Sequence, residues 1–260
     1  MVWGYVPTPG IKGLVYKLVG HPHPIGRLRA KVALKYIEKL KTIDVGCGEG
    51  IYVIELSKRG LDMTGIDDHR ESIIHAREKC KLSCVNPKLY IAGAEKIPAK
   101  RGEYEQAICF DVIEHVKDPN KVLKEINRIL KLGGKLILTV PNRLYLKDSI
   151  IPYDFENHIK AIGHIRYGYF HIELKSLLEK NGFRTTEYEY YYKFFSRFII
   201  EIFYSILGSK RIQEGRKGMY KHSILSLIVF ALLYPFMNLD VFLKRYTGGC
   251  VLVKAYKICS

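Results

Sequence analysis

Three glycines at alternate positions follow a short apolar segment that ends in an acidic residue. Asp44 comes first, and Gly46, Gly48 and Gly50 follow it. Glycine lets the backbone turn tightly and approach a ligand closely because it has no Cβ atom. A helical pattern begins directly after the last glycine, and the first turn of a helix presents N–H groups that have no partner within the helix. This order of strand, turn and helix predicts a nucleotide-binding corner.

A second acidic position supports this interpretation. Asp67 ends the next apolar segment and is followed directly by Asp68. In dinucleotide-binding folds, a carboxylate about 20 positions after the glycine-rich turn accepts hydrogen bonds from ribose hydroxyls. The alternative is a solvated loop aspartate, which this spacing disfavours.

A third group combines carboxylates with an imidazole: Asp111, Glu114 and His115 stand at positions i, i+3 and i+4. On a helix these positions share one face, and oxygen ligands with one imidazole suit Mg²⁺ or Mn²⁺. The alternative, which we favour, is that no metal binds here and that His115 caps a turn or lines the wall of the site.

Strands and helices alternate along the first half of the chain. Apolar spacing predicts a helix over residues 25–40 that leads into the first strand. Strands are expected at 42–45, 63–66, 89–92, 106–110 and 135–140, with helices at 52–59, 70–79 and 120–130. This alternation indicates a doubly wound parallel α/β sheet. A further helix at 171–180 and strands at 183–192 and 250–258 complete the pattern.

The glycine-rich octet at 43–50, Ile-Asp-Val-Gly-Cys-Gly-Glu-Gly, resembles motif I of the class I S-adenosylmethionine (SAM)-dependent methyltransferases. Segments 92–98, 109–119 and 130–142 resemble later motifs of the type 11 methyltransferases and of the ubiquinone-pathway O-methyltransferases, in the expected order. The resemblance covers roughly residues 40–142. It implies a seven-stranded Rossmann-like sheet whose last two strands are antiparallel, with SAM as the cofactor.

The resemblance also implies which residues hold SAM. Arg29, or alternatively Arg27, would pair with the methionine carboxylate, although a surface arginine on an amphipathic helix is an equal alternative. Gly93 stands where the family usually has an aspartate, so contacts to adenine fall to the backbone or to Glu95. The full set of expected cofactor residues is Arg29, Asp44, Gly46, Cys47, Gly48, Gly50, Asp67, Asp68, Gly93, Ala94, Glu95, Phe110 and Asp111.

The sulfonium of SAM is an activated methyl donor, so the protein mainly has to align the acceptor and exclude water. A general base is needed only if the acceptor must lose a proton. His115 and His164 are the catalytic candidates, followed by His158 and His171. Methylation of a nucleobase is disfavoured, because no Asn/Asp-Pro-Pro-Tyr/Phe motif follows the fourth strand and no Pro-Cys nucleophile is present.

Residues 193–249 interrupt the expected final hairpin and predict a helical cap, so the domain itself comprises 1–192 and 250–260. Segment 209–221 carries five cations and one acidic residue, and 223–239 is uncharged and mostly apolar. Segment 223–239 is short for a membrane span and contains Pro235. We expect a lid over the acceptor pocket or an element at an anionic membrane surface; a cap packed on the sheet or a dimer face is the alternative. The residues expected to line the lid are Phe194, Phe198, Phe203, Phe230 and Tyr234.

The composition limits the classes of binding partner but does not identify one. The net charge of +16 favours polyanions, or else is a solvated lysine-rich coat. Six cysteines without a regular framework indicate reduced thiols of a cytosolic protein, and the abundance of Lys, Glu and Ile is typical of thermophiles. We therefore expect a cytoplasmic enzyme, with a peripheral membrane contact as an option, that methylates a hydroxyl of a hydrophobic or lipid-linked small molecule. The alternatives are an RNA 2′-O-methyltransferase and a SAM-binding scaffold without turnover.

Overall fold

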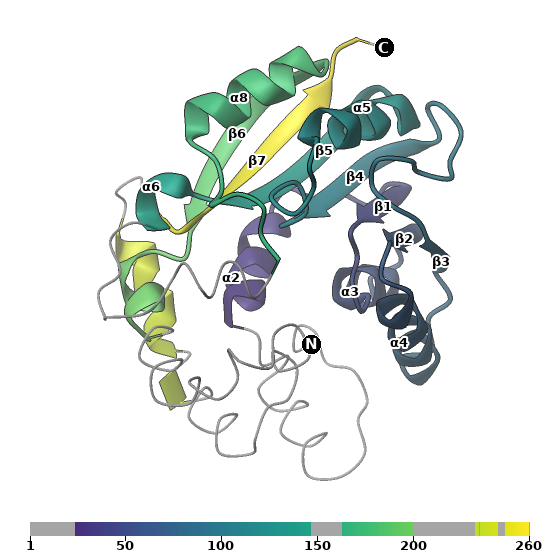
Figure 1. Cartoon of the computed structure of the whole chain (residues 1–260). Helices are drawn as coiled ribbons and strands as arrows, with labels where there is room; N and C mark the ends of the chain where they lie inside the picture. The colour runs from purple at the N-terminus through teal and green to yellow at the C-terminus, as the bar shows by residue number, and fades with distance from the viewer. Residues whose placement is uncertain (1–23, 147–162, 200–231, 234, 244–247, 260) are drawn as a thin grey trace.

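The computed structural model describes residues 24–146, 163–199, 232–233, 235–243 and 248–259. Within them lies one seven-stranded sheet with the order β3-β2-β1-β4-β5-β7-β6 (Figure 1). Strands β1 to β5 are parallel, and β7 runs antiparallel between β5 and β6. The expected doubly wound methyltransferase sheet is thus confirmed. The strands are β1 (Thr42–Val45), β2 (Met63–Asp67), β3 (Lys88–Ile91), β4 (Tyr104–Phe110), β5 (Leu130–Pro141), β6 (Phe183–Tyr191) and β7 (Cys250–Lys257).

Helices cover both faces of this sheet, because successive side chains of a strand point to opposite faces. On β4, Ile108 packs into the core that also contains side chains of α2, α3 and α4. Its neighbours Ala107 and Cys109 pack into the other core, which contains side chains of α5 and α8. The helices are α2 (Pro24–Ala33), α3 (Ile51–Lys58), α4 (Arg70–Leu82), α5 (Pro119–Ile129), α6 (Arg143–Leu146) and α8 (His171–Lys180), with a short 3₁₀ helix η1 (Asn238–Phe242).

The register of the sheet brings the functional strand ends together. Asp44 on β1 is aligned with Gly65 on β2, and Val45 is aligned with Cys109 on β4. Parallel strands end at the same edge of a sheet, and ligands of such folds bind outside the carboxyl ends, where the strand order reverses. In this sheet the order reverses between β1 and β4.

The helix predicted over residues 25–40 is shorter than expected. Helix α2 ends at Ala33, and the chain then turns so that the backbone N–H of Glu38 donates to Gln106 Oε1 at 3.1 Å. Lys135, which is almost buried on β5, donates to the carbonyl oxygen of Tyr36 and pairs with Glu38. These tertiary contacts hold residues 36–38 against the strands and override the apolar spacing.

The two ends of the expected cap are tied together beside the carboxyl end of β5, where β6 ends and β7 begins. Residues 194–199 are helical, and Asp240 of η1 accepts from the backbone N–H groups of Lys193 and Phe195 at 2.9 and 2.8 Å. The N–H of Gly249 donates to the carbonyl oxygen of Tyr192 at 2.8 Å. The cationic segment 209–221 and the residues Phe203, Phe230 and Tyr234 lie outside the described residues, so the cap as a whole stays a prediction. Among the described helices, none has the length and apolarity needed to cross a bilayer.

Candidate functional site

The glycine-rich turn lies at the carboxyl end of β1 and leaves open space above it. Gly46 has a φ of +77°, and a Cβ atom there would lie 2.3 Å from Val112 Cγ2, so a larger residue would clash. Gly48 has a φ of +52°, and none of the described atoms comes within 4 Å of the place where its Cβ would stand. Gly50 is the N-cap of α3. The turn is therefore a cradle whose ligand side is open, which is what a bound nucleoside requires.

Asp67 connects this turn to the end of β2. Its Oδ2 accepts from the N–H of Gly48 at 2.8 Å, and its Oδ1 accepts from the N–H of His69 at 2.9 Å. A carboxylate has about four lone-pair sites, so capacity for further donors remains. Asp68 is exposed beside it, and Gly93, Ala94 and Glu95 follow the end of β3.

Arg29 reaches from α2 to the end of β4, where it pairs with Asp111. Its Nε donates to the hydroxyl of Tyr52 at 2.8 Å, and that hydroxyl donates to the carbonyl oxygen of Gly26 at 3.1 Å. Asp111 also accepts from Thr139 Oγ1 at 2.9 Å and has a φ of +54°, an uncommon conformation for a non-glycine residue. The structure thus favours Arg29, rather than Arg27, as the arginine of this cluster.

Two aromatic rings enclose the guanidinium. Phe110 and Tyr52 meet edge to face with ring centroids 4.8 Å apart, and the guanidinium carbon of Arg29 lies 5.5 and 5.3 Å from the two centroids. Sequence reasoning found Phe110 but missed Tyr52 and Thr139. An aromatic residue in the first turn of a helix and a threonine within a strand carry no local signal of such a role.

Asp44 is a buried acidic residue of this corner, with 2% of its surface exposed. Its Oδ2 has no hydrogen-bond partner among the described residues. Burial raises the pKa of Asp44 to about 8; nearby Asp67 adds to this, and Arg29 opposes it. Asp44 is therefore a buried acid close to its titration point at neutral pH.

The stretch from Asp111 to His115 forms a turn rather than a helix, so the expected shared helical face is wrong. Asp111 turns to Arg29, whereas Glu114 is fully buried and neither of its carboxylate oxygens has a partner among the described residues. Burial raises the pKa of Glu114 well above its ordinary value, and the neighbouring Asp111 raises it further.

His115 and His164 come together beside Glu114. Their ring centroids lie 4.4 Å apart at 83°, and His115 Nδ1 lies 3.0 Å from the carbonyl oxygen of Gly163. One ligand atom from each of Glu114, His115 and His164 falls within 4.8 Å of the others. This donor set is one that a divalent cation can use. Asp111 does not belong to it.

Arg166 holds the second histidine segment in place. It donates to the carbonyl oxygens of Ile113 and Lys117 and to the hydroxyl of Tyr169. The N–H of Ile165 donates to the carbonyl oxygen of Glu114 at 3.0 Å. These bonds place residues 163–169 against the turn that follows β4.

Neither of the other two histidine candidates is part of the described histidine pair. His171 lies on α8 and packs against Tyr188, with ring centroids 4.3 Å apart, and so takes no part in the pair. His158 lies outside the described residues.

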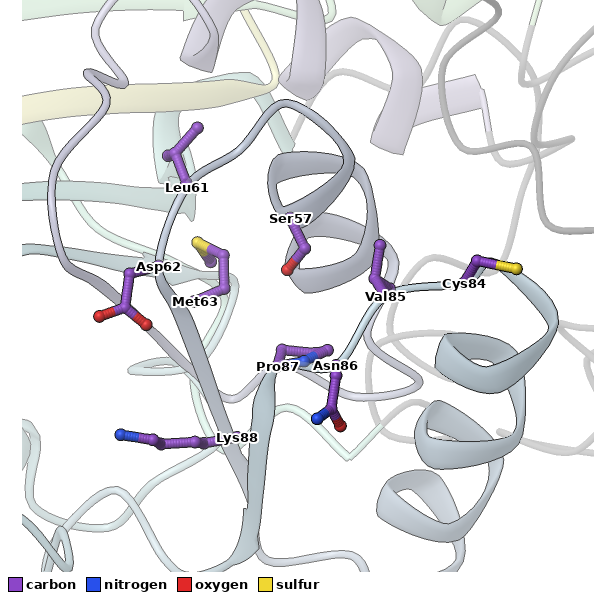
Figure 2. Close-up of a pocket in the computed structure, with 9 residues that line it drawn as sticks. All are labelled: Ser57, Leu61, Asp62, Met63, Cys84, Val85, Asn86, Pro87 and Lys88. Atoms are coloured by element: carbon purple, nitrogen blue, oxygen red, sulfur yellow. The ribbon is translucent and has the colours of Figure 1, made fainter.

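A separate cavity of about 300 Å³ lies at the opposite end of the strands (Figure 2). It opens beside the first residues of β2 and β3, Met63 and Lys88, whereas the glycine-rich turn is at their carboxyl ends. It is therefore not part of the cofactor corner. Its lining residues are Ser57, Leu61, Asp62, Met63, Cys84, Val85, Asn86, Pro87 and Lys88.

Comparisons with known proteins agree with this geometry. Residues 21–188 match the family model described as a methyltransferase domain. The chain belongs to this family and is a SAM-dependent methyltransferase of class I.

Among similar proteins are ubiquinone biosynthesis O-methyltransferases. The one from Methylococcus capsulatus is 35% identical over 104 residues, which are 40% of this chain and 44% of the relative. The one from Vibrio parahaemolyticus is 32% identical over 129 residues, 46% and 53% of the two chains. The chain thus spans about half the length of these curated relatives, and their substrates are not assigned to it by similarity alone.

Solved structures share the fold at low identity. An S-adenosylmethionine-dependent methyltransferase from Mesorhizobium loti superposes with a TM-score of 0.61 at 13% identity, over 90% of this chain and 99% of that one. Phosphoethanolamine N-methyltransferase 2 of Haemonchus contortus, solved with S-adenosyl-L-methionine, gives 0.60 at 18% identity, over 94% and 55%. The [4+2]-cyclase SpnF gives 0.59 at 17% identity, over 100% and 88%. Proteins with such different reactions show that the fold does not define the acceptor.

Proposed function

We propose that the protein transfers the SAM methyl group to a hydroxyl of a hydrophobic or lipid-linked small molecule. The observation that carries this proposal is the contact between His115 Nδ1 and the carbonyl oxygen of Gly163 at 3.0 Å. A carbonyl oxygen only accepts hydrogen bonds, so Nδ1 carries the proton in the neutral ring. Nε2 then has the lone pair that accepts a proton, as a general base requires.

Methylation of a hydroxyl group is the reaction that needs such a base. An oxygen that becomes methylated must lose its proton during the reaction, and a positioned imidazole contributes about 10²–10⁴-fold to such a step. The similar proteins named above are O-methyltransferases, which supports an oxygen acceptor. His115 accepts the proton in this proposal, and His164, whose ring packs edge to face on it, holds the ring in position.

SAM itself supplies a methyl group on a positively charged sulfur. In the proposal the open turn at Gly46, Gly48 and Gly50 holds the nucleoside, with Cys47 between them, and Asp67 accepts from the ribose. Arg29 receives the methionine carboxylate, in exchange for part of its pairing with Asp111. Gly93, Ala94, Glu95 and Asp68 border the adenine, and Phe110 forms the wall of the methionine site. The open space at Gly48 and the engaged carboxylate of Asp67 support this arrangement.

Exposed aromatic side chains near the two ends of the expected cap support a hydrophobic acceptor or a membrane contact. Phe194 and Phe198 are exposed and stacked, with ring planes 5° apart and centroids 6.3 Å apart, and Phe236 and Phe242 are more than half exposed. Such a patch marks a contact surface. We propose that residues 193–249 form a lid that admits the acceptor and meets an anionic membrane surface in the cytoplasm; a homodimer through this patch is the competing outcome.

A second candidate is a methyltransferase that acts on RNA at the ribose 2′-hydroxyl. The net charge of +16 favours a polyanion, and Glu114, His115 and His164 offer ligand atoms for a cation beside the expected methyl site.

Labelled-methyl transfer decides between these functions. Purified protein and SAM with a labelled methyl group are incubated with fractionated lipid, RNA and protein pools from cells. Label in the lipid or small-molecule pool, lost in a His115→Asn variant that still binds SAM, supports the proposal. Label in RNA supports the second candidate. Tight SAM binding without label in any pool would mean that the protein is a SAM-binding scaffold.

A further inference from the structure

Among the described residues, carboxyl groups outnumber cations around the cofactor corner, and Arg29 is a cation that acts on several of them. Arg29 is bound to Asp111 and to Tyr52, so it is not free to pair with Asp44. Asp44 feels Arg29 only at longer range and feels the carboxylate of Asp67 as well. The free site therefore holds more negative groups than its arginine neutralises.

The excess of carboxyl groups over cations affects the protonation of Asp44. It is buried at the end of β1, and its Oδ2 has no hydrogen-bond partner among the described residues. A buried carboxyl without a partner favours its neutral form, since a buried charge is costly to leave uncompensated. Burial raises the pKa of Asp44 to about 8, so the protonated form is favoured at pH 7.

Two thiols, a phenol and a guanidinium face Asp44 from the surrounding elements and keep one charge state near neutral pH. Burial raises the pKa of Cys47 in the glycine-rich turn and of Cys109 on β4 well above the ordinary value, and it raises that of Tyr52 on α3. Arg29 on α2 stays protonated, and the carboxylate of Asp67 on β2 accepts two backbone N–H groups. Asp44 is accordingly the group of this set that changes charge near neutrality.

The cofactor brings the missing positive charge. SAM has an ammonium group and a sulfonium centre, whereas the product S-adenosylhomocysteine (SAH) keeps the ammonium and loses the sulfonium charge. A cation near a buried carboxyl favours the ionised form of that carboxyl.

We propose that Asp44 senses the charge of the cofactor: its buried carboxyl is protonated in the free protein and releases that proton to the solvent when SAM binds, whereas SAH drives this ionisation less. No bond other than that of the proton changes. This change in the protonation of Asp44 links cofactor exchange to methyl transfer. Loss of the sulfonium charge makes the ionised Asp44 less stable and so weakens product binding.

The sign of the pH dependence follows. SAM lowers the pKa of Asp44 from its value in the free protein, so the affinity for SAM rises with pH up to about 8 and levels off above it. At most one proton is released per SAM, which corresponds to about a tenfold gain in affinity per pH unit. The affinity for SAH should rise less steeply.

Isothermal titration calorimetry tests the proposal. SAM is titrated at pH 7 into protein in three buffers that differ in ionisation enthalpy, and the slope of the observed enthalpy against buffer enthalpy gives the protons released. Wild-type protein should release about 0.5–0.9 proton with SAM and clearly less with SAH. An analogue that carries a protonated amine in place of the sulfonium should behave like SAM.

The matched variants are Asp44→Asn and Asp67→Asn, which neutralise the acids at the ends of two neighbouring strands. Asp44→Asn should lose most of the proton release, leaving only what the SAM amino group itself contributes. Asp67→Asn should bind more weakly and release somewhat less than the wild type, because Asp67 helps to raise the pKa of Asp44, but clearly more than Asp44→Asn. Equal slopes for wild-type protein and Asp44→Asn would overturn the proposal. If Asp44→Asn does not fold, the wild-type SAM affinity from pH 6 to 8 decides: a flat profile refutes the proposal, and a rise that exceeds the rise for SAH supports it.

Discussion

The Oδ2 atom of Asp67 lies 2.8 Å from the backbone nitrogen of Gly48. This hydrogen bond joins the end of β2 to the glycine-rich turn after β1, so the group expected to bind the ribose also holds the turn that shapes the nucleoside cradle. One substitution at Asp67 therefore disturbs two parts of the cofactor site.

Replacing Asp67 by Ala should weaken SAM binding by about 1.5–3 kcal/mol, the range for a hydrogen bond to a charged group. Calorimetry measures this directly. Asp62→Ala, directly before β2 and in the lining of the separate cavity, is the matched control and should leave the SAM affinity unchanged. An Asp67→Ala variant that binds SAM as tightly as the wild type would remove Asp67 from the cofactor site.

Replacing His115 by Asn should lower kcat about 10²–10⁴-fold once an acceptor is in hand, because the base that takes the hydroxyl proton is lost. The SAM affinity should change little, since His115 acts on the acceptor. His171→Asn is the control, because His171 packs on Tyr188 away from the pair. If His115→Asn and His171→Asn had equal kcat values, His115 would be a wall residue and not the base.

Removal of divalent cations should leave turnover unchanged, because the sulfonium of SAM is already an activated methyl donor that needs no Lewis acid. The measurement is the rate of methyl transfer before and after treatment with EDTA. A loss of activity that Mg²⁺ or Mn²⁺ restores would contradict this expectation and would assign a cation to Glu114, His115 and His164.

The protein should float with anionic liposomes at low salt and be released as the ionic strength rises, since salt screens the attraction between a basic segment and lipid headgroups. Neutral liposomes are the control. Replacing both Phe194 and Phe198 by Ser should reduce flotation, because these rings are exposed apolar surface within the expected cap. The patch would be a dimer interface if the protein did not bind anionic vesicles, was dimeric in solution, and became monomeric with both substitutions.

The sequence alone determined the fold and the cradle of the cofactor. Both depend on local patterns: alternating strand and helix periods for the sheet, and glycines behind Asp44 for the turn. The backbone at Gly46 and Gly48 adopts positive φ values that glycine accommodates without strain, so residue type alone indicated the conformation. Asp67 was found because its distance along the chain from the turn follows from the length of one helix and one strand.

Only the tertiary structure decided which side chains meet. Arg29 and Asp111 are 82 positions apart and come together because α2 packs in the same core as β4, while the turn at 111–115 removes the predicted shared helical face. The pairing of His115 with His164 depends on Arg166 and Ile165 binding the turn after β4. The burial of Asp44 and Glu114 is likewise a property of packing, since a carboxylate in the sequence carries no sign of whether water will reach it.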